Sequence, residues 1–564
     1  MKNLFIATVF SLLVVSGGSA QDISGDWTGT LHAGAADLHL VLHIVKGDGG
    51  SLAATLDSVD QAANGIPVSS VSLQDSKLSL GIDAVHGTYE GAVSSDGNTI
   101  SGTWSQGQDL PLDFKRSAAP VKPQHQPAKP SDIDGTWLGT LVISADAKLR
   151  IVFHIVNTED GLMATLDSPD QGVKGLPTSK VSRDKAALRI EIEKISGVFT
   201  GLIAADLSSI DGTFTQGSSL PLSLHRVKDE AELELKRPQN PTKPYPYHDE
   251  DVSYENKVQN VTLAATLTIP QGKGPFPAVV LITGSGPQDR DESLLGHKPF
   301  LVLSDYLTRH GIAVLRADDR GTGKSTGNFA TATTADFATD TEAGIAYLKT
   351  RPEVNPKKIG LIGHSEGGII APMVAARNPD VAFIVMMAGS GVPGDEILVA
   401  QVEAIDESSG KTHAEAVQAG TREREILNLI KTEKDPAVLE KKLKDKMAED
   451  GLEAQLGIEI KALTSPWFRF FMTYDPATAL RKVTCPVLAL NGEKDRQVPA
   501  KQNLPAIRKA LEEGGNKHFE IVELPGLNHL FQTAKTGSPN EYAQIEETIA
   551  PVALDTMTVW ILKQ

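Results

Sequence analysis

One serine of this chain stands in a setting that is typical of nucleophilic catalysis. Ser365 is the centre of the letters GHSEG, which follow the apolar run 359–362 and precede the helix-like run 367–378. A serine at a sharp turn between a strand and a helix exposes its hydroxyl, and the flanking glycines relieve contacts with the neighbouring backbone. The spacing therefore predicts that Ser365 attacks acyl carbon atoms. The side chain of His364 is expected to point away from the Ser365 hydroxyl.

A serine nucleophile of this type needs an acid and a base that follow it in the order Ser, Asp or Glu, His. Asp495 comes just after the apolar run 486–492, and His529 follows a further strand-like run. We predict that His529 removes the Ser365 proton, while Asp495 fixes the tautomer of His529 and stabilises its imidazolium. Glu493 is the rival of Asp495, which lies further into the loop, where a carboxylate can reach back toward an imidazole.

The negative oxygen that forms during acyl transfer needs two backbone N–H donors. The N–H of Glu366, directly after the nucleophile, is the first predicted donor. The second is expected in the glycine-rich loop after the apolar run 278–284, where the backbone can approach a substrate closely. Ser285 is the predicted donor in this loop, and Gly284 is its neighbour.

Five apolar runs with helical stretches between them must position these groups. They cover residues 278–284, 312–321, 358–368, 382–391 and 486–495. Such an alternation predicts a mostly parallel sheet with helices on both faces, in which functional groups gather where the strands end at their carboxyl edge.

A charged, helix-patterned insertion over about residues 392–478 predicts a helical lid above the site. It ends in the most aromatic stretch of this part of the chain. Trp467, Phe468, Phe470 and Phe471 are expected either to line an acyl pocket or to dock the lid on the core, and both interpretations stay open.

The letters GKS in the segment DDRGTGKST imitate the end of a phosphate-binding loop, but an aspartate occupies the position where that motif needs a glycine. Nucleotide binding is therefore not expected. Asp319 and Arg320 are predicted instead to fix the turn through ion pairs near Asp289 or Asp291.

The first part of the chain contains a tandem duplication, in which matching motifs lie 110 positions apart. The matching residues are Trp27 with Trp137, Asp57 with Asp167, and Trp104 with Phe214. Short alternating segments separated by turn formers predict a small antiparallel barrel or sandwich in each copy. Either the tryptophans and the matching His43 and His154 line a ligand cavity, or the tryptophans plug the two cores while the histidines face solvent. The second interpretation is favoured.

These patterns divide the chain into segments. The predicted order is a signal peptide (1–20), a β domain (21–117), a Pro-rich linker (118–131), a second β domain (132–228), a second linker (229–248) and the catalytic part with its lid (249–564). The basic start, apolar run and small-residue end of the first segment predict export to the periplasm or medium of a bacterium. The other apolar runs are too short to cross a bilayer, so no transmembrane anchor is expected.

The composition narrows the possible partners. Hydrophobic residues make up 40% and charged residues 22%, as in ordinary globular proteins, and the formal net charge is −17. This acidity argues against nucleic-acid and anionic-membrane partners. Cys485 is the only cysteine, so neither an intramolecular disulfide nor a thiolate metal cluster is possible. No metal or cofactor is predicted, and the sequence does not identify a partner of the β repeats.

Several motifs together resemble the EstD-type bacterial carboxylesterases of the α/β-hydrolase superfamily. The segments are TGSGPQDRD, ADDRGTGKSTG, GHSEGG, SPWFRFF and LALNGEKDRQVP, so the resemblance covers roughly residues 250–564. It implies an α/β-hydrolase fold and a serine esterase that needs no cofactor. The implied substrates are small-molecule esters with short-to-medium acyl chains. Transferred residue by residue, it gives Ser365 as nucleophile, Asp495 as acid and His529 as base.

Two other functions stay open at this point. An aminopeptidase or a thioesterase would use the same three residues, because fold and triad do not determine the substrate. A ligand-binding protein with a vestigial hydrolase part is the third possibility, and the complete serine, acid and histidine set argues against it.

Overall fold

The computed structural model describes residues 23–449 and 463–564, apart from short gaps. The gaps are residues 34–35, 47–51, 59–62, 69, 75, 83–86, 95, 106–108, 117–129, 144–147, 159–160, 172 and 230–231. The predicted signal peptide and most of the predicted linker 118–131 therefore lie outside the described residues.

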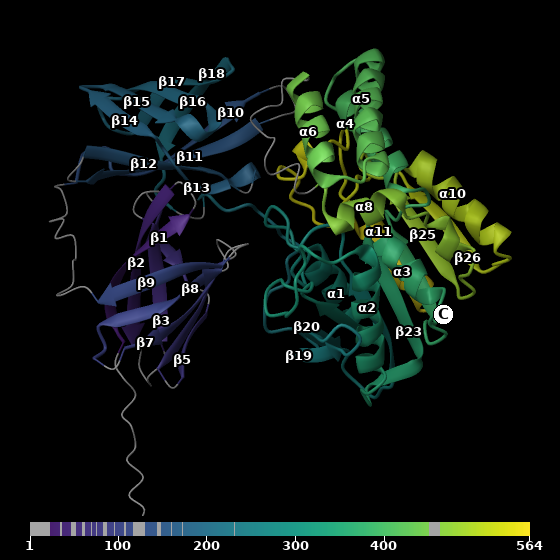
Figure 1. The fold of residues 1–564 in the computed structure, drawn as a ribbon. Helices are drawn as coiled ribbons and strands as arrows, with labels where there is room; N and C mark the ends of the chain where they lie inside the picture. The colour runs from purple at the N-terminus through teal and green to yellow at the C-terminus, as the bar shows by residue number, and fades with distance from the viewer. Residues whose placement is uncertain are drawn as a thin grey trace, which may run out of the picture.

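Two nine-stranded antiparallel sheets form the first part of the chain (Figure 1). The first consists of β1 (Gly25–Ala33), β2 (Ala36–Lys46), β3 (Leu52–Ser58), β4 (Ala63–Pro67), β5 (Ser70–Gln74), β6 (Lys77–Ile82), β7 (Gly87–Val93), β8 (Thr99–Ser105) and β9 (Asp109–Arg116). The second consists of β10 (Gly135–Val142), β11 (Lys148–Thr158), β12 (Gly161–Ser168), β13 (Val173–Pro177), β14 (Lys180–Asp184), β15 (Ala187–Ile192), β16 (Gly197–Ile203), β17 (Ser209–Gln216) and β18 (Ser218–Arg226). Both have the same strand order, β4-β3-β2-β1-β9-β8-β7-β6-β5 and its counterpart, as a duplication requires. Because each copy is one continuous sheet around one core, it is barrel-like rather than a two-sheet sandwich.

The duplicated tryptophans lie in these cores. Trp27 and Trp137 are fully buried, and their indole N–H groups donate to main-chain carbonyls 3.0 and 2.9 Å away. Arg116 and Arg226 lie over the two rings, 4.4 and 4.5 Å from the ring centres. In each copy, the tryptophan ring thus lies in the barrel core, and the guanidinium of the arginine covers it.

The matching histidines lie outside the cores. His43 and His154 are partly exposed, and the Nε2 atoms contact the carboxylates of Asp57 and Asp167 at 3.0 and 2.9 Å. The favoured interpretation of the repeats, with tryptophans in the cores and histidines toward solvent, therefore agrees with the structure.

An eight-stranded sheet forms the core of the catalytic part. Its strands are β19 (His248–Asn256), β20 (Val261–Ile269), β21 (Phe276–Ile282), β22 (Ala313–Ala317), β23 (Val354–His364), β24 (Phe383–Met387), β25 (Val487–Gly492) and β26 (Phe519–Leu524). Their order is β19-β20-β22-β21-β23-β24-β25-β26, and all neighbours from β22 onward are parallel. The antiparallel hairpin β19–β20 at one end was not among the predicted runs.

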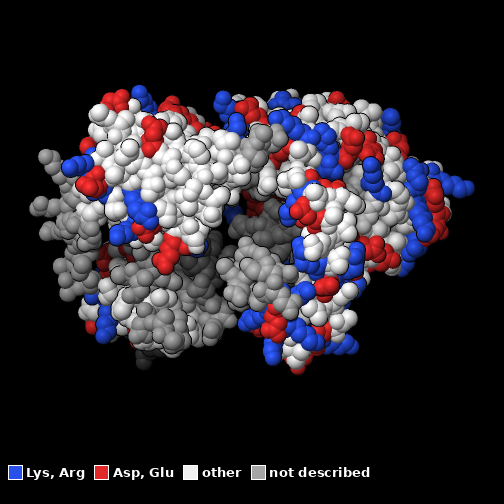
Figure 2. All heavy atoms as spheres, turned by 90° about the horizontal axis from the view of Figure 1, so that it is seen from above, with Lys and Arg blue, Asp and Glu red and all other residues white. Residues whose placement is uncertain are grey.

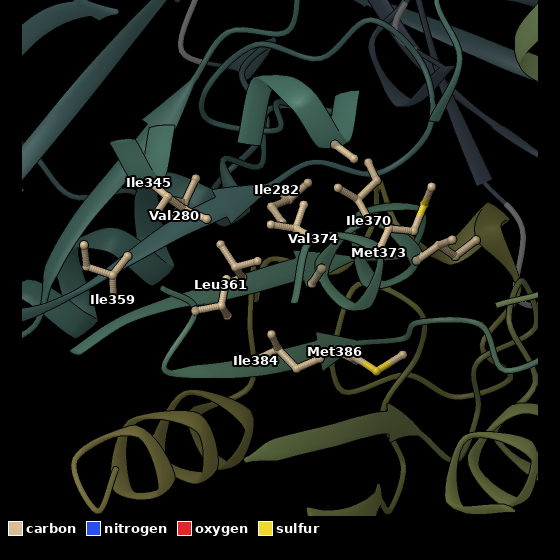
Figure 3. Packing of buried hydrophobic residues seen from close by; sticks show 14 of the residues in the cluster. Val280, Ile282, Ile345, Ile359, Leu361, Ile370, Met373, Val374, Ile384 and Met386 are labelled. Carbon is tan, nitrogen blue, oxygen red and sulfur yellow. The ribbon is translucent and has the colours of Figure 1, made fainter. Parts of the chain in front are cut away.

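Helices cover both faces of this sheet, as predicted. One face carries α1 (Pro299–Arg309) and α11 (Pro551–Ile561); the other carries α2 (Thr334–Leu348), α3 (Gly367–Ala375), α9 (Ala477–Leu480) and α10 (Ala500–Glu513). Figure 3 shows Ile282 and Leu361 from the strands packed beside Ile370 and Val374 of α3. Burial of these apolar side chains holds α3, including its N-terminal end, against the sheet.

The predicted insertion is helical. It contains α4 (Gly394–Ser408), α5 (His413–Thr432), α6 (Pro436–Glu449) and α8 (Pro466–Thr473), between β24 and β25. The four helices share a small apolar core that includes Leu427, Ile430 and Phe468. Figure 1 shows α8 on the side of the insertion that faces the sheet.

The surface carries both signs of charge. Figure 2 shows lysine and arginine interspersed with aspartate and glutamate over the catalytic part, and few charges on the adjoining face of the β part. Within the described residues, every helix is too short or too polar to pass through a bilayer.

Candidate active site

Ser365 sits at a strained turn at the centre of the sheet. It follows β23 directly and has a φ of 53°, a left-handed conformation that disfavours residues with a Cβ. The flanking glycines are required by space. A Cβ on Gly363 would lie 1.9 Å from the Gly367 carbonyl oxygen, and one on Gly367 would lie 2.2 Å from the Ile282 carbonyl oxygen. The turn therefore presents the serine side chain at the carboxyl edge of the strands.

Asp495 and His529 form a buried pair. His529 Nδ1 lies 2.8 Å from Asp495 Oδ2, and both residues are almost fully buried. The other carboxylate oxygen accepts the backbone N–H groups of Gln497 and Val498, at 2.9 and 2.8 Å. Because the carboxylate only accepts, Nδ1 of His529 carries the hydrogen and Nε2 keeps a free lone pair.

Glu493, the rival acid, does not contact His529 through any described hydrogen bond. Its carboxylate accepts the backbone N–H of Gly526 at 2.9 Å and so fixes the loop that follows β26. The structure thus brings Asp495 to the histidine, as predicted from its deeper position in the loop.

One cavity of about 340 Å³ collects the other predicted residues. It is lined by Ser285, Ser365, Glu366, Trp467, Phe468, Phe471 and His529, together with residues of β-strand ends and of α4. A volume of this size is at the lower end of ordinary small-molecule sites.

The loop after β21 supplies one wall of this cavity. The N–H of Gly284 donates to Glu292 Oε1 at 2.7 Å, so it is already engaged. A Cβ built on Gly284 would be 3.4 Å from the Ser365 Cβ, which shows how closely the loop approaches the nucleophile. The geometry therefore favours Ser285 over its neighbour as the second N–H donor, with Glu366 at the start of α3 as the first.

The side chain of Glu366 has a role that the sequence did not reveal. Its Oε1 accepts hydrogen bonds from the Thr334 hydroxyl and from the Trp467 indole N–H, both at 2.7 Å. Burial raises the pKa of this carboxyl, while the hydrogen bonds from Thr334, Trp467 and Ser285 lower it. Trp467 also stacks on Phe471, with ring centres 5.4 Å apart. Trp467, Phe468 and Phe471 therefore line the cavity, whereas Phe470 does not line it and packs against the core and Tyr474.

His364 is held on both of its nitrogens. Nδ1 lies 3.0 Å from Glu292 Oε1, and Nε2 lies 3.1 Å from the main-chain oxygen of His529. The pKa of His364 is raised: burial alone would lower it, but the charge of Glu292 and the hydrogen bonds to Glu292 and His529 outweigh burial. Glu292 was not predicted, because it is one of several acids in a polar loop and nothing in its spacing distinguishes it.

The predicted ion pairs of Asp319 and Arg320 are wrong in their partners. Arg320 pairs with Asp340 of α2, Nε to Oδ2 at 2.7 Å, and not with Asp289 or Asp291. The turn after β22 lies beside α2 in the folded chain, and the sequence alone does not show that this helix is its neighbour.

Asp319 makes no ion pair among its described contacts. It accepts the Thr283 hydroxyl at 2.8 Å and the Gln288 N–H at 2.9 Å, and burial raises its pKa to about 8. It therefore ties the turn after β22 to the loop after β21 as a buried acid. Asp291 pairs with Arg316 instead, at 3.0 Å.

The described residues include no group of three or more His, Cys, Asp or Glu side chains that is placed to hold a metal ion. Cys485 is half-buried against the apolar core, and burial raises the pKa of its thiol to about 11. It thus packs as a small apolar side chain, as expected.

Comparison with known proteins shows which hydrolases this chain is similar to. Residues 299–533 match the model of the hydrolase family described as serine aminopeptidase S33. Esterase EstD of Thermotoga maritima is 26% identical over 436 residues, which cover 76% of this chain and 98% of that protein. This match is longer than residues 250–564, so it continues into the preceding β part.

Solved structures of esterases are also similar. Esterase Pf2001 of Pyrococcus furiosus is 15% identical, with a TM-score of 0.35, and the match covers 56% of this chain and 92% of that chain. Est1E of Butyrivibrio proteoclasticus, solved with ferulic acid, is 18% identical with a TM-score of 0.34 and covers 56% of this chain and 98% of its own.

The family match and the EstD relative confirm the resemblance that the motifs indicate. The predicted fold class agrees with the mostly parallel sheet, its two helical layers and the preceding β sheets. Together, the family match and the EstD relative support an EstD-like α/β-hydrolase in the catalytic part of this chain.

Proposed function

We propose that this chain hydrolyses carboxylic esters of short-to-medium acyl chains through Ser365, His529 and Asp495. The observation that carries the proposal is the buried 2.8 Å contact between His529 and Asp495, at a cavity that also contains the strained Ser365. A base with a fixed tautomer at a cavity that a serine also lines is the arrangement that acyl transfer needs.

The proposed reaction has two stages. His529 Nε2 takes the hydroxyl proton as Ser365 Oγ attacks the carbonyl carbon, and the N–H groups of Ser285 and Glu366 hold the negative oxygen. The proton then passes to the departing alcohol oxygen, the ester C–O bond breaks, and an acyl-enzyme remains. Water, activated by His529 in the same way, releases the acid and restores Ser365.

The lining of the cavity supports a neutral, apolar acyl group. Its apolar residues are Leu294, Pro299, Ile369, Ile397, Leu398, Trp467, Phe468, Phe471, Val498 and Leu530. Among the described residues that line it, none is lysine or arginine, so nothing there would compensate an acyl chain with its own carboxylate. The volume of about 340 Å³ supports short or medium chains.

The aminopeptidase alternative has one observation in its favour, because the matching family model bears that description. An aminopeptidase must bind the charged amino group of its substrate, for which a free carboxylate is the natural partner. Glu292 and Glu366 are the acids that line the cavity, and both already accept hydrogen bonds from the protein itself. This arrangement favours the ester.

The test is hydrolysis of p-nitrophenyl acetate, butyrate and octanoate by residues 21–564, beside the variant Ser365→Ala. Ser293→Ala, an exposed serine in the loop after β21, is the matched control. We expect turnover in the parent and control, loss of at least about 10³-fold in Ser365→Ala, and retained secondary structure in all three. Equal turnover in parent and Ser365→Ala would contradict the proposal, and cleavage of aminoacyl-naphthylamides but not of esters would establish the peptidase.

A further inference from the structure

A second acid–imidazole pair lies beside the pair formed by Asp495 and His529. Glu292 Oε1 is 3.0 Å from His364 Nδ1, and His364 Nε2 is 3.1 Å from the main-chain oxygen of His529. Glu292, His364 and His529 are all almost fully buried. Glu292 has a φ of 53°, so the fold holds this side chain in place against the local preference of its backbone.

This pair connects two loops that the reaction must align. The same Glu292 oxygen accepts the N–H of Gly284 at 2.7 Å. A continuous chain of hydrogen bonds therefore runs from the loop that carries Ser285, through Glu292 and His364, to the backbone of His529. Loss of one member would loosen the N–H donor loop, the backbone of His529 or both.

The hydrogen atoms in this chain are assigned by their partners. The carbonyl oxygen of His529 can only accept, so His364 Nε2 carries a hydrogen. The Glu292 carboxylate also only accepts, so its 3.0 Å contact needs a hydrogen on Nδ1. Burial lowers the pKa of His364, but the charge and hydrogen bond of Glu292 raise it overall, which agrees with this second hydrogen. His364 is then an imidazolium paired with the Glu292 carboxylate.

We propose, on the basis of the acyl-transfer function above, that Glu292 and His364 are positioning residues that align the oxyanion loop and set the protonation of His529. The rings of His364 and His529 have centres 4.9 Å apart. Because the two rings are neighbours, we expect removal of the charge on His364 to change the pH at which His529 accepts a proton.

The ionisable groups that face this pair come from three further positions. Asp495 interacts with His364 through its charge and bonds to the far side of the His529 ring. Asp319, next to Glu292, is buried with a pKa of about 8 and is therefore largely uncharged at neutral pH. Glu366, on the other side of the loop, is held by Thr334 and Trp467. The variants below leave all three in place.

Two substitutions at His364 test the charge of this residue and its hydrogen bonds separately. His364→Gln can place an amide N–H near the position of Nε2, so it keeps the donor to the His529 carbonyl and removes the charge. His364→Asn can place its amide near Nδ1, so it keeps contact with Glu292 and loses the bond to His529. Glu292→Gln removes the negative charge but keeps the size of the side chain. Glu523→Gln, at an exposed position of β26, is the matched control.

We expect the acidic limb of the kcat/KM pH profile to move upward by about 0.5–1 unit in His364→Gln, with its plateau kcat within about fivefold of the parent. Glu292→Gln and His364→Asn should lower plateau kcat by about 10–100-fold with KM changed less than about threefold, because the reacting groups are misplaced. In Glu292→Gln, the acidic limb should move less than in His364→Gln, because burial then lowers the pKa of His364 and the pair loses both of its charges together. Glu523→Gln should match the parent in every parameter.

An unchanged acidic limb in His364→Gln, or a kcat within threefold of the parent in Glu292→Gln, would overturn the proposal. If Glu292→Gln does not fold, Glu292→Asp replaces it; this variant keeps the charge and should lower kcat without moving the limb. The rate of labelling of Ser365 by a fluorophosphonate is measured for each protein across the same pH range. Because labelling needs the base and the oxyanion donors but no ester, it tests the inference even if the ester assignment fails.

Discussion

At the scale of single residues, Asp495 is held by three hydrogen bonds. It accepts hydrogen bonds from His529 and from two backbone N–H groups. Asp495→Asn keeps the shape, but its amide can donate to Nδ1 and so favours the wrong tautomer of His529. We expect kcat for p-nitrophenyl butyrate to fall by about 10²–10⁴-fold, with thermal unfolding near that of the parent. A kcat within threefold of the parent would show that another acid, such as Glu493, serves His529.

The sequence predicted the site residues that lie in a recognisable motif. It missed those that are linked to the site only by contacts in the folded chain. Ser365, Asp495 and His529 each follow an apolar run, and the spacing of glycines around the serine has one physical explanation. Glu292 and the carboxyl of Glu366 could not be found in this way, because their partners are distant in the chain. For Arg320, the sequence indicated an ion pair but placed the acid on the wrong loop.

At the scale of elements, α8 is joined to the nucleophile turn by one hydrogen bond between Trp467 and Glu366. Trp467→Phe keeps the stack on Phe471 but leaves the carboxylate with one donor fewer, which should loosen α8 over the cavity. We expect KM for p-nitrophenyl octanoate to rise about 5–10-fold, and KM for the acetate to rise less, because a short chain contacts less of the lid.

Thr334→Val is the matched control for this prediction, since it removes the other donor to the same Glu366 oxygen without touching α8. It should not change KM in a way that depends on chain length. If both variants change all KM values equally, the lid does not select acyl length and Trp467 only stabilises Glu366.

The elements themselves were predictable where apolar runs were long. The strands β21 to β25 coincide with continuous apolar runs, whose burial on both faces leaves little ambiguity. The hairpin β19–β20 was missed because β19 is rich in charged residues and follows a Pro-rich segment, so it resembles a linker. Its partner β20 is buried almost throughout, and its position beside β22 decides the pairing.

At the scale of the whole molecule, the catalytic part and the second β domain are tied together near the active site. Gln544 donates to the carbonyl of Lys148 in β11 at 3.0 Å. Arg237, between the two parts, donates to the carbonyls of Leu295 and Ala543, each at 2.8 Å. Leu295 lies next to Leu294, which lines the cavity. The segment that follows the β repeats thus supports the same loop that carries Glu292.

Arg237→Ala should therefore affect catalysis from outside the cavity. It leaves two main-chain carbonyls without this donor at a partly buried position, so the loop that bears Leu294 and Glu292 should become more mobile. We expect kcat/KM for p-nitrophenyl butyrate to fall about 3–10-fold and amide hydrogen exchange in residues 285–298 to rise.

Arg116→Ala is the matched control, because that guanidinium covers Trp27 and bonds to Ser24 and Gly97 within the first β domain. It should destabilise that domain and leave the kinetics unchanged. Equal kinetic losses in the two variants would mean that the β repeats act on the hydrolase through overall stability and not through the loop.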